Sequence, residues 1–508
     1  MPEGCGPQDM LALWHEGQRA FWSAAGAKPA FADASAFAPE GLDVFDSWAE
    51  ALLRGTAGSE SAGAVRASAR YRDVVLACWG RIRQAFETHR RAIYDPNAPL
   101  TDWRLLRDRW FQIAEAEFIQ LMQSEAFLDA QRGVIRAAID LWPRAPEALR
   151  DPRARSWRAP EAVSAMLDTT VPIAQTPRKT VWTEGKTTLS RYEPLGHGGV
   201  ALGPVLICHG LIGRQSMIDL RPDRSLVRNL LAAGVDVFVI DWGDAGAEDS
   251  GLGLDHFAGR HLSGAIRAAL EASGADDLVL FGICQGGTLA AIHMASRPKG
   301  VRGLITAVAP FDFHADTQDA DPAHGLLNIW VRSLDVADLE GLIGLEGNLS
   351  GELMGLIFNQ LNPVRTLEKY LIRMVDAAGD PGTLQTFAAM ERWLADRPDL
   401  PGALARTWLV DLYRENALAE GKLRFMGDPV DLGRINVPVL NVVASADHIV
   451  PPPCSRALGR LVGKAPYREL SMPTGHIGTF VSARAQVLLP PAITSFLAET
   501  RNAPFPPH

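Results

Sequence analysis

The segment LVLFGICQGGTLAAIH, residues 278–293, limits the fold of this chain more than any other. Its first residues are apolar, as in a buried strand, and the residues after the glycines have the composition of a helix. Between them lies Cys284, with Gly282 and Gly286 two residues before and after it. Side chains at these two positions would collide in a sharp turn, and Gly287 would let the helix pack closely. The pattern predicts a strand, a turn that presents a cysteine, and a helix.

Other short apolar runs rich in β-branched residues alternate with helical patterns along the chain. They are PVLIC (204–208), DVFVID (236–241), GLITAVA (303–309) and VPVLNVVA (437–444). Such strands, alternating with helices, are typical of a parallel sheet covered on both faces. A hairpin with its turn at Glu184-Gly185 is expected before them, in KTVWTEGKTTLSRYE. A cysteine turn in this setting is a nucleophile elbow, so we predict an α/β-hydrolase fold.

The predicted catalytic domain carries an insertion and follows a helical region. Residues 310–436 are too many for one crossover, and we predict a mainly helical cap over about 311–427. The first 165 residues have helical periodicity, and a Pro- and Arg-rich stretch at 143–161 indicates a boundary. The sequence therefore predicts an all-α domain over 1–165 and an α/β-hydrolase domain over 166–508.

The elbow also predicts an acid and then a histidine, each in a loop after a late strand. Asp447 follows the strand in VPVLNVVASADHIVPP, and His476 follows the short strand in YRELSMPTGHIG. We predict Cys284 as nucleophile, with Asp447 and His476 as its acid and base. His448 could also serve as a base, although its neighbours favour an orienting or capping role.

An oxyanion hole is expected in the loop after the strand PVLIC, where His209 and Gly210 begin HGLIGR. The backbone N–H groups of Leu211 and Gln285 would be its donors. His209 is a candidate catalytic group, but a histidine at this position is more often one that fixes the loop.

Several segments together resemble the polyhydroxyalkanoate synthases. They are RPDRSLVRNLL (221–231), DVFVIDWG (236–243), GICQGG (282–287), MERWLADRPDLPG (390–402), VDLGRINVPVLNVVASADHIVPP (430–452) and GHIG (475–478). The likeness covers about residues 180–500, and this region is similar in size to the class III catalytic subunit. It implies that Cys284, Asp447 and His476 are the family's catalytic residues. The His-Gly pair at 209–210, and Gly213 where the family usually has asparagine, depart from its pattern.

The resemblance implies polymerisation of (R)-3-hydroxyacyl-CoA, with 3-hydroxybutyryl-CoA as the expected substrate, onto a growing polyester chain. It further implies a homodimer at the surface of polyhydroxyalkanoate granules. Residues 102–137 resemble the accessory subunit of class III enzymes, which suggests a natural fusion. Two alternatives stay open, a cysteine-dependent acyl-CoA thioesterase or hydrolase and an inactive granule-associated scaffold.

Composition argues against several other classes of protein. The net charge of −9 gives no electrostatic reason to expect nucleic acid as a partner. The five cysteines are far apart and form no CxxC pair, so we expect neither disulfides nor a metal site. No window has the roughly 18 apolar residues of a transmembrane helix, and the first residues do not resemble a signal peptide. We therefore expect a cytoplasmic protein without a cofactor, for which the coenzyme A thioester is the substrate.

Overall fold

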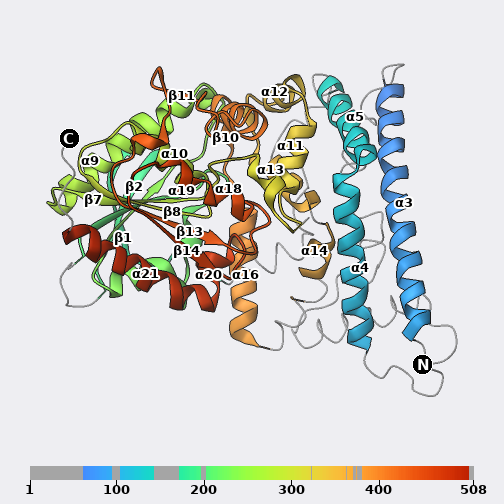
Figure 1. Cartoon of the computed structure of the whole chain (residues 1–508), viewed down its shortest axis with the longest axis horizontal. Coiled ribbons are helices and arrows are strands. Elements are labelled where there is room, and N and C mark those ends of the chain that lie inside the picture. Colours follow the sequence, from blue (N-terminus) through green and yellow to red (C-terminus); the bar gives the residue numbers. More distant parts are fainter. Residues whose placement is uncertain are drawn as a thin grey trace. The chain divides into compact units, whose positions relative to one another are not determined.

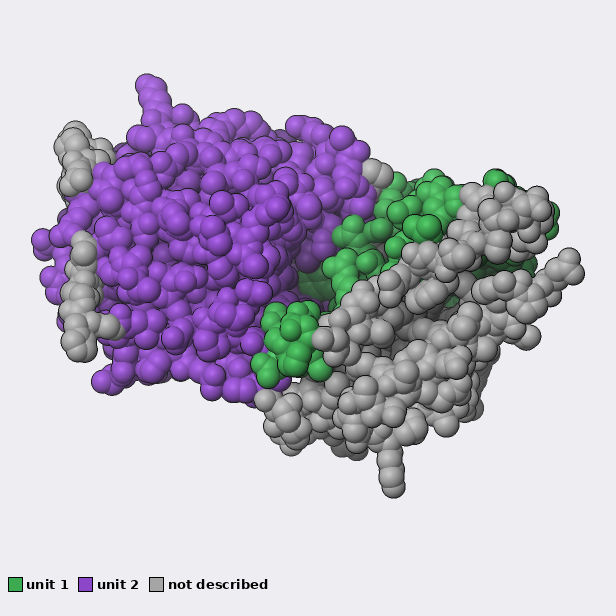
Figure 2. Space-filling model, turned by 90° about the horizontal axis from the view of Figure 1, so that it is seen from below, with its two compact units in different colours: residues 1–169, 356–388 green, residues 170–355, 389–508 purple. Residues whose placement is uncertain are grey.

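The computed structural model describes residues 61–93, 103–141, 171–195, 202–321, 323–361, 363–369, 373 and 380–502. The chain divides into two compact units, shown in different colours in Figure 2. Unit 1 contains residues 1–169 and 356–388, and unit 2 contains residues 170–355 and 389–508. The boundary predicted near residue 165 lies outside the described residues and stays a prediction. Residues 356–388, inside the predicted cap, group with unit 1.

The described part of unit 1 is helical, as its periodicity predicts. Its long helices are α3 (Ser61–Ile93), α4 (Trp103–Gln123) and α5 (Glu125–Leu141). Aromatic rings join α3 to α4, because Trp79 stacks on Trp110 at a centroid distance of 6.2 Å and meets the edge of Phe118 at 5.1 Å. The short helix α14 (Pro363–Glu368) is tied to α4 by an ion pair of 2.6 Å between Arg365 and Glu115.

Unit 2 is built on an eight-stranded sheet of order β1-β2-β6-β3-β7-β8-β13-β14. From β6 to β14 all neighbouring strands are parallel, and β1 and β2 form an antiparallel hairpin at one edge. The strands are β1 (Arg178–Glu184), β2 (Thr187–Tyr192), β3 (Pro204–Cys208), β6 (Asp236–Asp241), β7 (Leu278–Ile283), β8 (Val301–Ala307), β13 (Val439–Ala444) and β14 (Tyr467–Met472). The parallel sheet is confirmed, and the hairpin turn falls at Gly185 and Lys186, one residue later than predicted.

Helices cover the sheet, as its fully buried strands require. Every residue of β3, β7, β8 and β13 is buried. Figure 1 shows α9 (Leu262–Ser273) and α10 (Gln285–Ala295) above the sheet and α21 (Ala483–Asn502) below it. Helix α8 (Leu226–Ala232) packs against α21. The predicted α/β-hydrolase architecture is therefore present.

The chain between β8 and β13 is mainly helical, as predicted. It contains α11 (Leu326–Ser333), α12 (Val336–Gly344), α13 (Gly351–Leu361), α14, α16 (Pro381–Ala395), α17 (Gly402–Arg406) and the π-helix η9 (Thr407–Arg414). Short strands β9 (Asn348–Leu349) and β10 (Leu400–Pro401) pair with each other. Among the described residues, no helix is both long and apolar enough to cross a bilayer.

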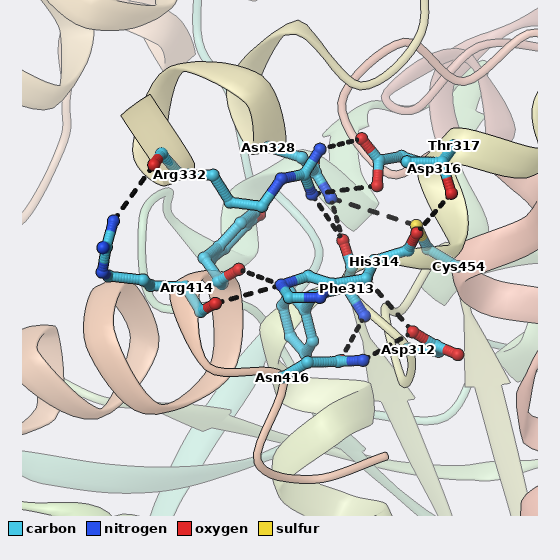
Figure 3. A network of polar contacts seen from close by, with 11 residues as sticks. Asp312, Phe313, His314, Asp316, Thr317, Asn328, Arg332, Arg414, Asn416 and Cys454 are labelled. Atoms are coloured by element: carbon cyan, nitrogen blue, oxygen red, sulfur yellow. Dashed lines mark hydrogen bonds and ion pairs between the residues drawn. The ribbon is translucent and has the colours of Figure 1, made fainter. Parts of the chain in front are cut away.

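A polar network fixes the root of this insertion (Figure 3). The carboxylate of Asp312, in the loop after β8, accepts a hydrogen bond of 2.8 Å from Asn416 Nδ2. The side-chain oxygen of Asn416 in turn accepts from the backbone N–H of Phe313 at 2.8 Å. Arg332, on α11, holds Asp316 with two hydrogen bonds of 2.9 and 2.6 Å. These bonds tie the start and the end of the insertion to the same loop.

Removal of Arg191 should destabilise unit 2. Its guanidinium makes two hydrogen bonds of 2.9 Å to Asp236, whose side chain is only 3% exposed. Arg191→Ala would leave this carboxylate buried without its cation, and we expect a loss of about 2–3 kcal/mol, measured as a lower melting temperature. Arg468→Ala removes the exposed pair with Glu499 and should cost about 1 kcal/mol or less. Equal losses in the two variants would contradict this account.

Candidate active site

Cys284 lies in the turn between β7 and α10 with φ 53° and ψ −127°. This is a left-handed backbone conformation that L-residues rarely adopt, and it persists only where the surroundings enforce it. The N–H of Cys284 donates to the carbonyl of Ala307 on β8 at 2.9 Å. A Cβ on Gly286 would run into the carbonyl groups of Cys208 and His209, so a side chain is excluded there. The predicted elbow is present, and its thiol is free and half-buried.

Asp447 and His476 come together at the carboxyl edge of the sheet. They lie in the loops after β13 and β14, which are parallel neighbours. His476 Nδ1 is 2.7 Å from Asp447 Oδ2, while Asp447 Oδ1 accepts from the backbone N–H groups of Ile449 and Val450 at 2.9 Å each. Asp447 is 1% exposed and His476 is 7% exposed. The aspartate can therefore orient the imidazole firmly.

The electrostatics of His476 link this pair to the elbow. Burial by itself lowers the pKa of His476, but the charge of Asp447, the charge of Cys284 and side-chain hydrogen bonds to both outweigh it. The result is a pKa well above the ordinary value of 6.5. Because Asp447 engages Nδ1, Nε2 is the nitrogen that faces Cys284. The arrangement places a ring that holds its proton strongly beside the Cys284 thiol.

The expected oxyanion donors lie close to the elbow, but one is engaged. The backbone N–H of Leu211 donates to the side-chain oxygen of Gln285 at 3.1 Å. A Cβ on Gly210 would lie 3.4 Å from Cys284 Cβ, so this loop passes directly against the nucleophile. The side-chain oxygen of Gln285 thus accepts the Leu211 N–H that a substrate oxyanion would need as its donor. The oxyanion roles of Leu211 and Gln285 stay predictions.

The two supporting histidines differ in their surroundings. Burial lowers the pKa of His209 to about 4, so its ring is neutral, and Nδ1 lies 3.0 Å from the carbonyl oxygen of Gly210. The indole N–H of Trp242 donates to the His209 carbonyl at 2.8 Å. These contacts are those of a residue that fixes its loop. His448 is half-buried beside Asp447, and its role stays a prediction.

Residues of the insertion that sequence analysis did not identify also reach this region. The indole N–H of Trp393 donates to the Arg214 carbonyl at 2.8 Å, and a Cβ on Gly213 would lie 2.6 Å from the Trp393 ring. Glycine at 213 is therefore explained by Trp393. Burial, and next the charge of Cys284, raise the pKa of Tyr413, so its phenol stays protonated. Trp393 lies in the segment MERWLADRPDLPG, which carries the family resemblance but gave no sign of this contact, and no motif indicated Tyr413.

No group of three or more His, Cys, Asp or Glu residues could hold a metal ion within the described parts of the chain. The site consists of a thiol, an imidazole, a carboxylate and backbone N–H groups. Such a set can form a covalent acyl-enzyme and transfer its acyl group to an acceptor.

A family model described as the alpha/beta hydrolase fold matches residues 203–482. The chain belongs to this fold family. Poly(3-hydroxyalkanoate) polymerase subunit PhaC of Allochromatium vinosum is 39% identical over 64% of this chain and 88% of its own length. The proteins of the same name from Synechocystis sp. and Haloferax mediterranei are 33% and 32% identical, over 67% and 71% of this chain and 89% and 71% of their own lengths. The chain is thus a member of the poly(3-hydroxyalkanoate) polymerase family.

Gly286→Ala should disrupt the elbow. The new methyl group would meet backbone carbonyls, which cannot move without shifting β3, so we expect a stability loss of about 1–3 kcal/mol or more and a loss of Cys284 alkylation by iodoacetamide. Gly251→Ala is a matched control, because nothing lies within 4 Å of its added Cβ. Full stability and normal alkylation of Gly286→Ala would show that the turn is not restrained as described.

Asp447→Asn should lower the pKa of His476, because the charge that raises it is lost. A raised pKa keeps the imidazolium at neutral pH, and this form disappears as pH rises through the pKa. The alkaline limb of the pH profile of coenzyme A release should therefore move to lower pH, with a rate loss of about 10²–10⁴-fold. Asp428→Asn, at an exposed position on β12 (Asp428–Pro429), should change neither the alkaline limb nor the rate of coenzyme A release. An unmoved limb in Asp447→Asn would contradict this assignment.

Proposed function

We propose that this protein elongates a polyester by transferring 3-hydroxyacyl groups from coenzyme A thioesters, with Cys284 as the covalent carrier. The observation that supports it most directly is the strained Cys284 turn beside the buried His476–Asp447 pair. Membership of the polymerase family supplies the substrate class, an (R)-3-hydroxyacyl-CoA such as 3-hydroxybutyryl-CoA.

In the first step, the proton of the Cys284 thiol resides on His476 as an imidazolium, and the thiolate attacks the carbonyl carbon of the substrate thioester. The carbon–sulfur bond to coenzyme A breaks, and the imidazolium returns the proton to the leaving thiolate. The raised pKa of His476 suits this step, because the proton is held near the sulfur atoms until coenzyme A leaves. One thioester replaces another, so the acyl group remains activated.

In the second step, His476 removes the proton from the 3-hydroxyl of an incoming hydroxyacyl-CoA. The oxygen attacks the acyl carbon on Cys284, an ester bond forms, and the thiolate leaves and regains a proton. The lengthened chain is now a coenzyme A thioester and returns to Cys284 by the first step. Because an oxygen ester is more stable than a thioester, each cycle is driven forward. A serine nucleophile would lose that activation at once.

The proposal assigns the removal of the hydroxyl proton to His476 rather than to Asp447. Both carboxylate oxygens of Asp447 already accept hydrogen bonds, one from His476 and the other from Ile449 and Val450. The carboxylate is also 1% exposed, so a substrate hydroxyl could reach it only after these bonds break. Asp447 thus acts by orienting His476 and stabilising its charge.

Three further parts of the proposal rest on the family resemblance. Residues 1–165 would act as a fused accessory subunit, the protein would form a homodimer, and it would work in the cytoplasm at the surface of polymer granules. The helical fold of unit 1 is compatible with the first part. The thioesterase alternative uses the same three residues and differs only in taking water as the acceptor.

Cys284→Ala should abolish coenzyme A release from (R)-3-hydroxybutyryl-CoA, by about 10³-fold or more, because no other group can carry the acyl chain. Cys208→Ala and Cys454→Ala are controls, since burial raises the pKa of both thiols and keeps them protonated. Radiolabelled substrate should attach to Cys284 and yield polymer. Soluble hydroxy acid without polymer would instead establish the thioesterase.

A further inference from the structure

We infer that a cavity of about 270 Å³ beside the elbow binds the neutral polyester chain and not the coenzyme. The inference rests on the proposed function, because it names the place of the product of that reaction. The cavity is lined by the β1–β2 turn, the loops after β3 and β6, the π-helix η6 (Asp255–His261) and residues 398–401. All of these segments belong to unit 2.

The position of the cavity follows from the topology of the sheet. Strand β3 has β6 on one side and β7 on the other, and the chain visits β6 before β7. Loops that leave neighbouring parallel strands in opposite directions open a crevice at their carboxyl ends, where α/β proteins bind ligands. Leu211, after β3, and Trp242, after β6, both line the cavity. Leu211 follows Gly210, at which an added Cβ would lie 3.4 Å from Cys284 Cβ, so the loop that lines the cavity also passes the acyl carrier.

The charges around the cavity are already neutralised within the protein. Lys186 pairs with Glu248 at 2.5 Å and with Asp249 at 2.7 Å. Arg260, the other permanent cation of the lining, pairs with Glu184. Of the remaining acidic lining, Asp244 pairs with Arg214 at 2.5 Å, and Asp399 accepts a hydrogen bond of 2.8 Å from the backbone N–H of Gly351.

Coenzyme A carries several phosphate charges and needs free cations or backbone donors to bind them. Both cations of the lining are occupied, and burial lowers the pKa of His261, which keeps that ring neutral. A polyester of hydroxyacyl units carries no charge except at its end. The paired charges therefore favour the polymer over the coenzyme.

Apolar side chains form a further part of the wall. Leu211, Phe257 and Leu400 are 4%, 4% and 2% exposed, and their side chains line the cavity together with Leu252 and Ala245. Phe257 lies on η6, and π-helical turns often occur where a helix forms part of a functional site. The volume is just below the range of about 300–1,000 Å³ for drug-sized ligands, which suits a short stretch of chain.

The test measures binding without turnover. In a Cys284→Ala protein, a methyl-capped oligomer of (R)-3-hydroxybutyrate should bind by calorimetry, and adding Ala245→Trp should weaken it at least tenfold by filling the cavity. Ala247→Trp, at an exposed position outside the lining, is the matched control and should bind as the parent does. Leu252→Trp fills the cavity from another segment and replaces Ala245→Trp if circular dichroism shows that the first variant is unfolded.

Unchanged oligomer binding in the folded filled variant would overturn the inference. A filled variant that still binds the oligomer but no longer binds coenzyme A would also overturn the inference, because the cavity would then be a coenzyme site. A benzophenone-labelled oligomer, mapped by mass spectrometry on the Cys284→Ala protein, needs no filled variant. Crosslinks to the segments that line the cavity are expected, which are Leu211 and residues 184–187, 242–261 and 398–401. Crosslinks confined to other segments would contradict the inference. If the protein with Cys284 intact forms no polymer, the proposed function is rejected, whether or not the oligomer binds.

Discussion

The site depends on the backbone strain of a single residue, Cys284. A φ of 53° is costly for a residue with a Cβ, and it is kept because every neighbouring position leaves the turn no alternative. Strand β7 ends at Ile283, α10 begins at Gln285, and the carbonyls of Cys208 and His209 approach Gly286 so closely that they exclude any side chain there. The central strands thus fix the direction of the thiol, and chain elements far away in sequence need only supply its partners.

Those partners are held by a different kind of constraint, burial of charge. Asp447 is almost fully removed from water, and such a carboxylate is stable only when its oxygens are paired. The His476 ring and two backbone N–H groups satisfy it, which fixes the ring nitrogen that faces Cys284. The same burial that makes the carboxylate a strong orienting group also closes it to substrate. The contact between Asp447 and His476 therefore both stabilises the imidazolium and positions it.

Sequence reasoning succeeded where the determinants are local. Glycines two residues from a cysteine define the elbow, and apolar β-branched runs define a parallel sheet, so the fold and the positions of Cys284, Asp447 and His476 could be predicted. It failed where contacts join distant segments. The Gln285 side chain on the Leu211 N–H, and Trp393 against Gly213, depend on how loops pack, and no spacing encodes this. Likewise, the grouping of residues 356–388 with unit 1 depends on tertiary contacts.

Gln285 connects the strained turn to the expected oxyanion hole. Its side-chain oxygen accepts the hydrogen bond from Leu211 that a developing oxyanion would require. A thioester oxygen carrying negative charge is a stronger acceptor than a neutral amide, so it can displace Gln285 in the transition state. Leu211 also lines the cavity inferred to hold the polymer, so the expected oxyanion donor and the inferred polymer site share one residue.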